Sequence, residues 1–210
     1  MQKNIVCFGD SNTHGYRAED TKRFDEHTRW TKLLQKALGD GYNIVEEGLS
    51  GRTTCFEDPC FEGLSGVSVI YPTLMSHEPV DLLVIMLGTN DVKERFSATS
   101  ANIASGLERL VKKARSVECW SKGTYNILII TPTPILKGYE KTDCYPMMGA
   151  GCSEKSYELH SVFEAVAKNN GCHYLNAAFA ESNTIDYMHL CPNGHRQLAE
   201  KLAELIPTIL

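Results

Sequence analysis

The sequence predicts one α/β domain, a three-layer sandwich in which helices cover both faces of a parallel sheet. Short apolar runs alternate along the chain with segments of helical periodicity, which is the pattern of βαβ units. The length of 210 residues suits one such domain, which we expect to cover residues 1–210. A hydrophobic fraction of 42% and a charged fraction of 22% are ordinary for a globular protein and argue against disorder.

The first elements follow directly from these patterns. Residues 5–8 are apolar and predict the first strand. After a polar loop, apolar residues at helical spacing predict a helix over residues 30–38 that stops at Gly39. Residues 42–45 then predict a second strand, so the chain begins with a β-α-β unit.

The middle of the chain contains the strongest strand signal. Residues 81–87 form a nearly unbroken apolar run, which is typical of a central strand covered on both faces. Residues 67–75 before it predict a short helix, in which we expect Pro72 only near the first turn. After it, apolar residues at helical spacing predict a helix over residues 103–114, with Ser97, Thr99 or Ser100 as its N-cap.

The last third of the chain adds two more strands. Residues 126–131 predict a buried strand, and residues 172–176 predict the last strand. Two helices complete the pattern. The first covers residues 153–169, with Gly171 just past its end, and the second begins at Pro192. The segment 132–151 is rich in Pro, Gly and Tyr and predicts a long excursion over the sheet edge that is a candidate lid.

Charge and composition exclude several classes of binding partner. A net charge of −5 argues against binding to nucleic acid or anionic lipid, so we expect a small-molecule substrate. No segment reaches the roughly 18 consecutive apolar residues of a membrane span, and the N-terminal apolar run is too short for a signal peptide, so we expect a cytoplasmic protein without membrane contact. The eight cysteines show no CxxC pair and no zinc-site spacing. We therefore expect reduced thiols, no metal and no cofactor.

Polar clusters at the ends of the predicted strands are the candidate functional segments, because ligands of open parallel sheets bind at the carboxyl ends of the strands. Three clusters combine small residues with hydrogen-bond donors: residues 9–15, 48–53 and 88–91. A fourth cluster, residues 186–189, precedes the last helix and places Asp186 three positions before His189. At this spacing the carboxylate can fix the imidazole tautomer while the other ring nitrogen serves as a base, and Ser11 is the natural nucleophile for that base.

These four clusters, in this order, resemble the blocks of the SGNH (GDSL) hydrolase family. Gly9-Asp10-Ser11 resembles the nucleophile block, Gly51 the glycine block, residues 88–91 the asparagine block, and Asp186-x-x-His189 the acid and base. The resemblance spans nearly the whole chain and implies the flavodoxin-like SGNH hydrolase fold. Five further segments are similar to the arylesterase and acyltransferase branch that includes perhydrolases, which implies a homo-oligomer: residues 7–11, 29–31, 46–50, 52–54 and 85–91.

The resemblance also implies the catalytic roles. Ser11, His189 and Asp186 would be nucleophile, base and acid, and the Ser11 and Gly51 N–H groups with the Asn90 amide would form the oxyanion hole. The implied activity is hydrolysis of short-chain carboxylic esters through an acyl-serine intermediate, with possible acyl transfer. The GxSxG elbow of α/β-hydrolases does not occur in the chain.

Other polar residues near the blocks receive supporting roles. Asn12, His14 and Arg52 are candidate substrate-binding residues, although Arg52 equally suits a solvated surface position. We expect Asp10 and Asp91 to support their own loops through hydrogen bonds, and His195 to lie on a polar helix face. A metal held by Asp10, His14, Asp186 and His189 is the minority interpretation, because no HExxH-type spacing accompanies them.

Three alternatives stay open. A carbohydrate acetylesterase would use the same four blocks on acetylated sugars. A flavodoxin-like binding protein would use the hydroxyl-rich loop after the first strand to hold a flavin phosphate. A catalytically silent interaction protein would retain only the fold.

Overall fold

The computed structural model describes residues 2–210 and contains one five-stranded sheet in which all neighbouring strands are parallel. The strand order is β2-β1-β3-β4-β5. The five strands occupy the predicted places, with bounds Lys3–Gly9, Tyr42–Gly48, Leu82–Met86, Ile127–Thr131 and His173–Asn176. The predicted single α/β domain with a parallel sheet is confirmed.

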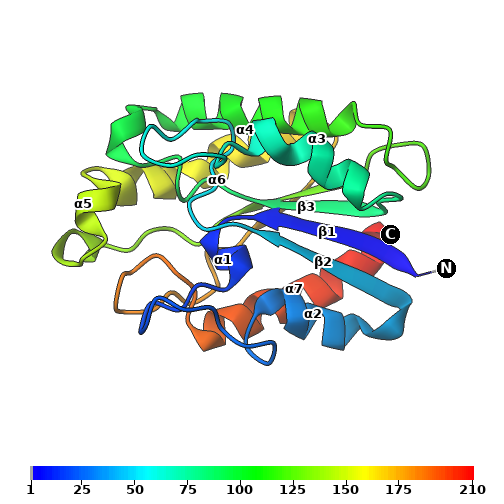
Figure 1. The fold of residues 1–210 in the computed structure, drawn as a ribbon, viewed down its shortest axis with the longest axis horizontal. Helices are drawn as coiled ribbons and strands as arrows, with labels where there is room; N and C mark the ends of the chain where they lie inside the picture. Colours follow the sequence, from blue (N-terminus) through cyan, green and yellow to red (C-terminus); the bar gives the residue numbers. More distant parts are fainter. Residues whose placement is uncertain (1) are drawn as a thin grey trace.

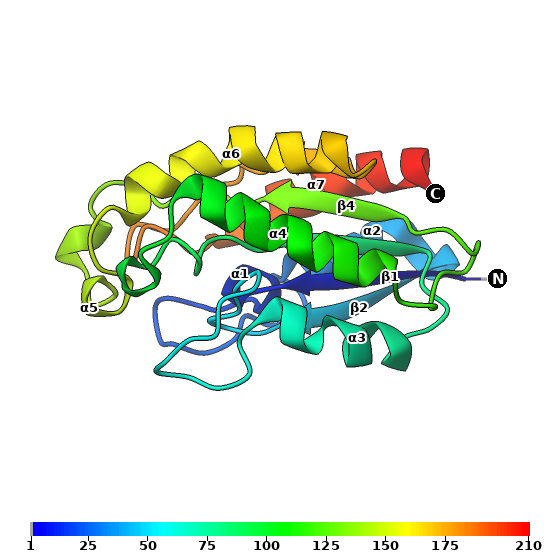
Figure 2. The ribbon, with the colours of Figure 1, turned by 90° about the horizontal axis from the view of Figure 1, so that it is seen from above.

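Helices cover both faces of the sheet, as predicted (Figures 1 and 2). One layer contains α2 and α7, which span Trp30–Leu38 and Pro192–Ile209. The other contains α3, α4 and α6, which span Gly66–Ser76, Ser100–Arg115 and Cys152–Asn169. Side chains of β1 alternate between the two layers, because successive residues of a strand point to opposite faces. Val6 and Phe8 pack toward α3, α4 and α6, whereas Ile5 and Cys7 pack toward α2 and α7.

Local chemistry explains where the long helices begin and end. Thr99 is the N-cap of α4 and forms a capping box with Asn102, so the second of the three candidate caps is the correct one. Pro192 is the first residue of α7, as its fixed φ angle favours. Gly39 ends α2 with a φ of +73°.

Short helical segments were not predicted. They are α1 at Ser11–His14, α5 at Tyr145–Met148, and the 3-10 turns η1, η2 and η3 at Gly39–Gly41, Glu94–Phe96 and Tyr139–Lys141. A segment of three or four residues is too short to show a hydrophobic period, so periodicity does not detect it.

The position expected for Pro72 is wrong. Pro72 is the seventh residue of α3, well beyond its first turn. Proline has no N–H to donate to the carbonyl of Ser68, four residues earlier. Both residues lie on the exposed side of the helix, where water can satisfy that carbonyl.

The sheet topology determines where a site can form. The chain leaves β1 for β2 on one side and later returns to β3 on the other side, so the strand order reverses at the end of β1. Gly9 at this end pairs with Gly48 of β2 and Met86 of β3, so the three strands end level. Helix α1 and the segment around α5 lie at this end of the molecule, opposite both termini (Figure 1).

Two further properties hold for residues 2–210. None of their helices combines the length and the apolar character that crossing a bilayer requires. All eight cysteines are free thiols.

Candidate active site

The first functional segment is the turn that follows β1. Asp10 caps α1 by accepting a hydrogen bond from the Asn12 N–H at 2.9 Å. Gly15 ends this short helix in the left-handed conformation, with φ +84°. Ser11 is the first residue of α1 and follows the end of β1 by two residues, so it lies directly beyond the carboxyl end of the sheet. It is 5% exposed.

The second functional segment is the turn before α7. The Asp186 Oδ1 atom accepts hydrogen bonds from the Met188 N–H, the His189 N–H and the Asn183 side-chain amide, each at 3.0 Å. Tyr187 between them has a φ of +63°, a strained conformation for a non-glycine residue. This tight turn brings the side chains of Asp186 and His189 to the same side.

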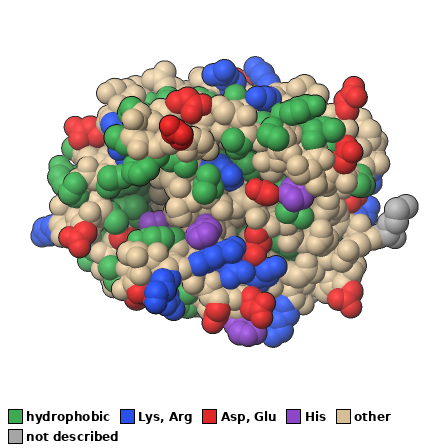
Figure 3. Space-filling model, viewed as in Figure 1, with side chains coloured by type: hydrophobic (Ala, Val, Ile, Leu, Met, Phe, Trp, Pro, Cys, Tyr) green, Lys and Arg blue, Asp and Glu red, His purple; other side chains and the backbone are tan. Residues whose placement is uncertain are grey.

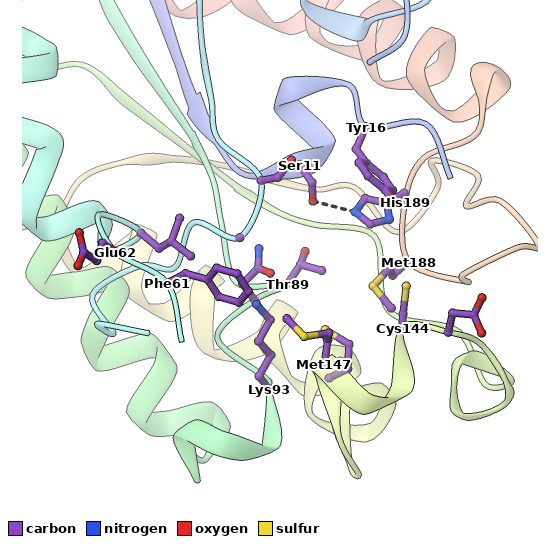
Figure 4. A pocket seen from close by; sticks show the side chains of 16 residues that line it. Ser11, Tyr16, Phe61, Glu62, Thr89, Lys93, Cys144, Met147, Met188 and His189 are labelled. Atoms are coloured by element: carbon purple, nitrogen blue, oxygen red, sulfur yellow. Dashed lines mark hydrogen bonds between the residues drawn. The ribbon is translucent and has the colours of Figure 1, made fainter. Parts of the chain in front are cut away.

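The two segments meet at the carboxyl end of the sheet. His189 Nε2 lies 2.8 Å from Ser11 Oγ, and His189 Nδ1 lies 2.7 Å from Asp186 Oδ2 (Figure 4). Ser11 and His189 are 178 residues apart in the sequence. Burial alone raises the pKa of Asp186, but the hydrogen bond and the charge of His189 more than offset it and lower that pKa to about 2. The carboxylate is therefore ionised and can orient the imidazole.

Two further groups present hydrogen-bond donors beside Ser11. Gly51 has a φ of +90°, and a Cβ atom there would lie 2.9 Å from Leu64, so the loop requires glycine. Asn90 uses one amide hydrogen to bond the Arg52 carbonyl at 3.2 Å, which leaves the other hydrogen free. Within residues 2–210, the N–H groups of Ser11 and Gly51 donate to no other group.

Comparisons with known proteins identify the family of this chain. The model of the GDSL-like lipase/acylhydrolase family matches residues 7–197. The chain belongs to this family. The assignment places it among the carboxylic ester hydrolases, and it confirms the resemblance found in the sequence.

Solved structures of this family are similar over their whole length. The aryl esterase of M. smegmatis is 33% identical, with a TM-score of 0.91, over 99% of this chain and 100% of that one. A carbohydrate acetylesterase family member from Sinorhizobium meliloti is 32% identical, with a TM-score of 0.91, over 100% of this chain and 99% of that one.

One curated relative is considerably longer than the GDSL-like chain. An acetylxylan esterase from Xylanibacter ruminicola is 24% identical over 96% of this chain. The chain spans only 42% of that relative's length.

Asn12 connects the two halves of the GDSL-like site. Its side-chain oxygen accepts from the Leu190 N–H at 2.8 Å, and its amide donates to the Met188 carbonyl at 3.3 Å. Trp30 at the start of α2 donates its indole N–H to the Asn12 carbonyl at 3.1 Å. These bonds hold the serine turn and the histidine turn together, so Asn12 acts as a positioning residue and does not line the cleft.

Asp91 connects the glycine loop to the asparagine loop. Its Oδ1 atom accepts from both the N–H and the hydroxyl of Thr54, so it reaches beyond its own turn. Asp91 and Asp10 are fully buried, and burial raises the pKa of each to about 6. Each carboxyl is therefore costly to ionise inside the folded protein.

We expect the stability of the Asp91→Asn variant, relative to that of wild type, to increase as the pH rises. Because the pKa of Asp91 is higher in the folded than in the unfolded chain, its carboxyl favours folding at low pH and loses this contribution between about pH 4 and 6. Asparagine has no such loss, so the difference in unfolding free energy should shift by on the order of 2–3 kcal/mol toward the variant. Urea denaturation of both proteins at pH 4 and pH 7.5 measures it. The same difference at both pH values would contradict a raised pKa.

A cleft of about 440 Å³ opens beside Ser11 and His189. Figure 3 shows it as a hollow bordered largely by hydrophobic side chains. Phe61 borders it from the loop after β2, and Met147 and Met148 from α5 (Figure 4). The excursion over residues 132–151 thus forms one wall of the cleft, in the place expected for a lid.

Like Asn12, the two other predicted substrate-binding residues lie away from the cleft. His14 does not line the cleft; its backbone packs closely against Gly48. Arg52 is 6% exposed and does not line the cleft; its guanidinium lies 4.1 Å over the Phe8 ring and donates to the Gly9 carbonyl at 3.0 Å. It is therefore neither a surface residue nor placed to contact substrate.

His195 also differs from its expected exposed position. It is completely buried between α7 and α2, and its Nδ1 atom accepts from the Trp30 N–H at 3.2 Å. Burial lowers its pKa to about 3, so it is neutral and structural.

Several residues of the site gave no recognised sequence signal. Tyr16 packs its ring against His189 with the ring centroids 4.5 Å apart. Asn183 holds Asp186, and Lys93 lines the cleft. Asn183 precedes Asp186 by only three residues in the sequence, but its hydrogen bond to Asp186 is evident only from the folded turn.

Proposed function

We propose that this chain is a serine esterase of short-chain carboxylic esters in which Ser11, His189 and Asp186 form the catalytic triad. The observation that carries the proposal is the continuous hydrogen-bonded series from Ser11 Oγ through His189 to Asp186. A serine hydroxyl is a useful nucleophile only beside a base, and this base is held in one orientation by a buried carboxylate.

In the proposed mechanism, each step is carried out by one of these groups. Ser11 Oγ attacks the ester carbonyl carbon while His189 Nε2 accepts the hydroxyl proton. The tetrahedral intermediate then collapses, its bond to the alcohol oxygen breaks, and His189 returns the proton to that oxygen. Water repeats the sequence on the acyl-serine and releases the carboxylic acid.

The Ser11 N–H, the Gly51 N–H and the Asn90 amide are the proposed oxyanion hole. All three residues line the cleft, and the Ser11 N–H, the Gly51 N–H and one Asn90 amide hydrogen make no hydrogen bond within residues 2–210. Donors fixed in advance stabilise the charge that develops on the carbonyl oxygen.

Asn90→Ala is expected to lower kcat roughly 10²–10³-fold, because removing one such donor costs about 3–4 kcal/mol of transition-state stabilisation. Steady-state rates with p-nitrophenyl acetate measure the loss. Asn102→Ala, which removes a surface capping residue of α4, is a matched control that should retain activity. Equal rates for Asn90→Ala and wild type would exclude the amide from the oxyanion hole.

Substrate preference within the esterases is the finer part of the proposal. The cleft of about 440 Å³ and its hydrophobic walls favour a short acyl chain and a compact alcohol. Aryl esters are the leading class, and acetylated sugars are the second, because relatives of both kinds are similar to this chain. Rates for p-nitrophenyl esters of increasing acyl length, compared with a panel of acetylated sugars, test this order. Absence of hydrolysis across both panels would contradict the proposed function.

Three further features belong to the same proposal. The acyl-serine transfers its acyl group to alcohols as well as to water, which transesterification in aqueous ethanol would reveal. The chain forms a homo-oligomer, which sedimentation would measure. It acts in the cytoplasm, as its reduced cysteines favour.

A further inference from the structure

Lys93 is a buried cation beside the proposed oxyanion hole. It follows Asn90 by three residues in the loop after β3, and its N–H donates to the Asn90 carbonyl at 3.3 Å. Its side chain lines the cleft and extends between Phe61 and Met147 (Figure 4). The residue is only 5% exposed, so its ammonium group is largely removed from bulk water.

Lys93 shares its ion-pair partner with a second cation. Asp58 Oδ2 lies 3.8 Å from Lys93 Nζ and 3.7 Å from Arg95 Nε, so one buried carboxylate serves two cations. Neither distance is that of a hydrogen bond. Within residues 2–210, no oxygen accepts a hydrogen bond from the Lys93 ammonium group, and Asp58, the carboxylate nearest to it, is shared with Arg95.

The acidic residues that line the cleft form no ion pair with Lys93. Glu62 and Asp143 line the cleft but are exposed, and neither forms an ion pair with Lys93. Figure 4 shows the Glu62 carboxylate directed away from the other labelled side chains. The cleft thus combines apolar walls with one buried, incompletely paired cation.

Such a cation attracts an anion. Burial, together with the charge of Arg95, lowers the pKa of Lys93, and the charges of Asp58, Asp10 and Asp91 offset this only in part. A carboxylate that reached the ammonium would form a charge-assisted hydrogen bond in surroundings where water competes little. A neutral hydroxyl would accept the hydrogen bond without balancing the charge.

We propose that Lys93 is a specificity-determining residue that selects ester substrates carrying a carboxylate group. This inference rests on the proposed esterase function and adds the substrate class. The carboxylate can belong to the acyl part or to the alcohol part of the ester, and these two sources are separated by the test.

Two matched substrate pairs separate the sources. Mono-4-nitrophenyl adipate and its neutral carboxamide differ in the acyl part. The acetate esters of 4-hydroxybenzoate and 4-hydroxybenzamide differ in the alcohol part. The measured quantity is the ratio of kcat/KM for the charged substrate to kcat/KM for its neutral counterpart, so a general loss of activity cancels.

Lys93→Met is expected to lower this ratio by roughly 10- to 100-fold in one of the two pairs, mainly through KM, because a charged hydrogen bond to substrate is lost. Lys93→Arg, which keeps the charge, should retain most of the preference. Asp58→Asn should raise the ratio, because it removes the carboxylate that partly compensates Lys93. A ratio that Lys93→Met leaves unchanged in both pairs would overturn the proposal.

If Lys93→Met does not fold, Asp58→Asn tests the role of Lys93 instead. A kcat/KM ratio that Asp58→Asn leaves unchanged would also overturn the proposal. Hydrolysis of the neutral substrates by wild type keeps the two proposals distinguishable. If neutral esters are cleaved and the ratios do not respond, the esterase function stands and the role of Lys93 fails.

Discussion

Ser11→Ala is expected to reduce kcat for p-nitrophenyl acetate by roughly 10⁴- to 10⁶-fold, because the variant has no nucleophile to form an acyl-enzyme. Ser11 is 5% exposed and its hydroxyl contacts His189, so alanine removes the reacting atom without creating a large cavity. KM should change little, because the walls of the cleft remain. Steady-state kinetics on purified wild type and variant measure both constants.

Ser161→Ala is a suitable control for that comparison. Ser161 lies on the exposed side of α6 and bonds only the Glu158 carbonyl within its own helix. Its substitution should leave kcat unchanged. Comparable activity of Ser11→Ala and wild type would mean that another group performs the chemistry.

Asp186→Asn is expected to lower kcat about 10⁴-fold, through the tautomer of His189. The side-chain oxygen of asparagine can keep the bonds that Oδ1 accepts from the turn, which places its amide nitrogen against His189 Nδ1. That amide donates, so Nδ1 must become the acceptor and Nε2 must carry the proton. An Nε2 that already carries a proton cannot accept one from Ser11.

Asp40→Asn on the exposed turn after α2 provides the charge-matched control and should keep wild-type activity. A crystal structure of Asp186→Asn with the turn intact would assign the loss to the tautomer. Wild-type kcat in a folded Asp186→Asn variant would show that this carboxylate does not orient the base.

Most of the fold was predictable from the sequence because its strands are buried. The run over residues 82–86 is apolar throughout, since both faces of β3 are covered by helices. Helix positions followed equally well where one face is apolar. The short helix at Ser11–His14 was not predictable from periodicity, because the Asp10 cap and the Gly15 stop define it instead.

Buried polar residues account for the wrong positions. Histidine and arginine are usually surface residues, so the sequence predicts His195 and Arg52 to be exposed. In the folded protein, the Trp30 N–H bonds His195. Arg52 is held by the Phe8 ring and a backbone carbonyl. Such partners come from distant parts of the chain. No local pattern in the sequence reports them.

The site also contains some residues that the sequence predicts and others that only the structure shows. The motif blocks single out Ser11, Asp186 and His189, and the structure brings these three side chains together. The sequence predicts Asn12 as a substrate-binding residue, but its hydrogen bonds to the histidine turn give it a positioning role instead. Nothing in the sequence marks Lys93, because a lysine three residues after an asparagine has the pattern of a solvated side chain, and only the structure shows its burial.

Covalent labelling with a fluorophosphonate, followed by peptide mass spectrometry, tests the pairing of hydroxyl and imidazole most directly. The reagent reacts with a serine that a neighbouring base activates. We expect one phosphonate per wild-type chain, on the peptide that contains Ser11, and labelling slowed by several orders of magnitude in His189→Ala. Rapid modification of a different residue, or labelling of Ser11 at the same rate without the His189 imidazole, would contradict the account.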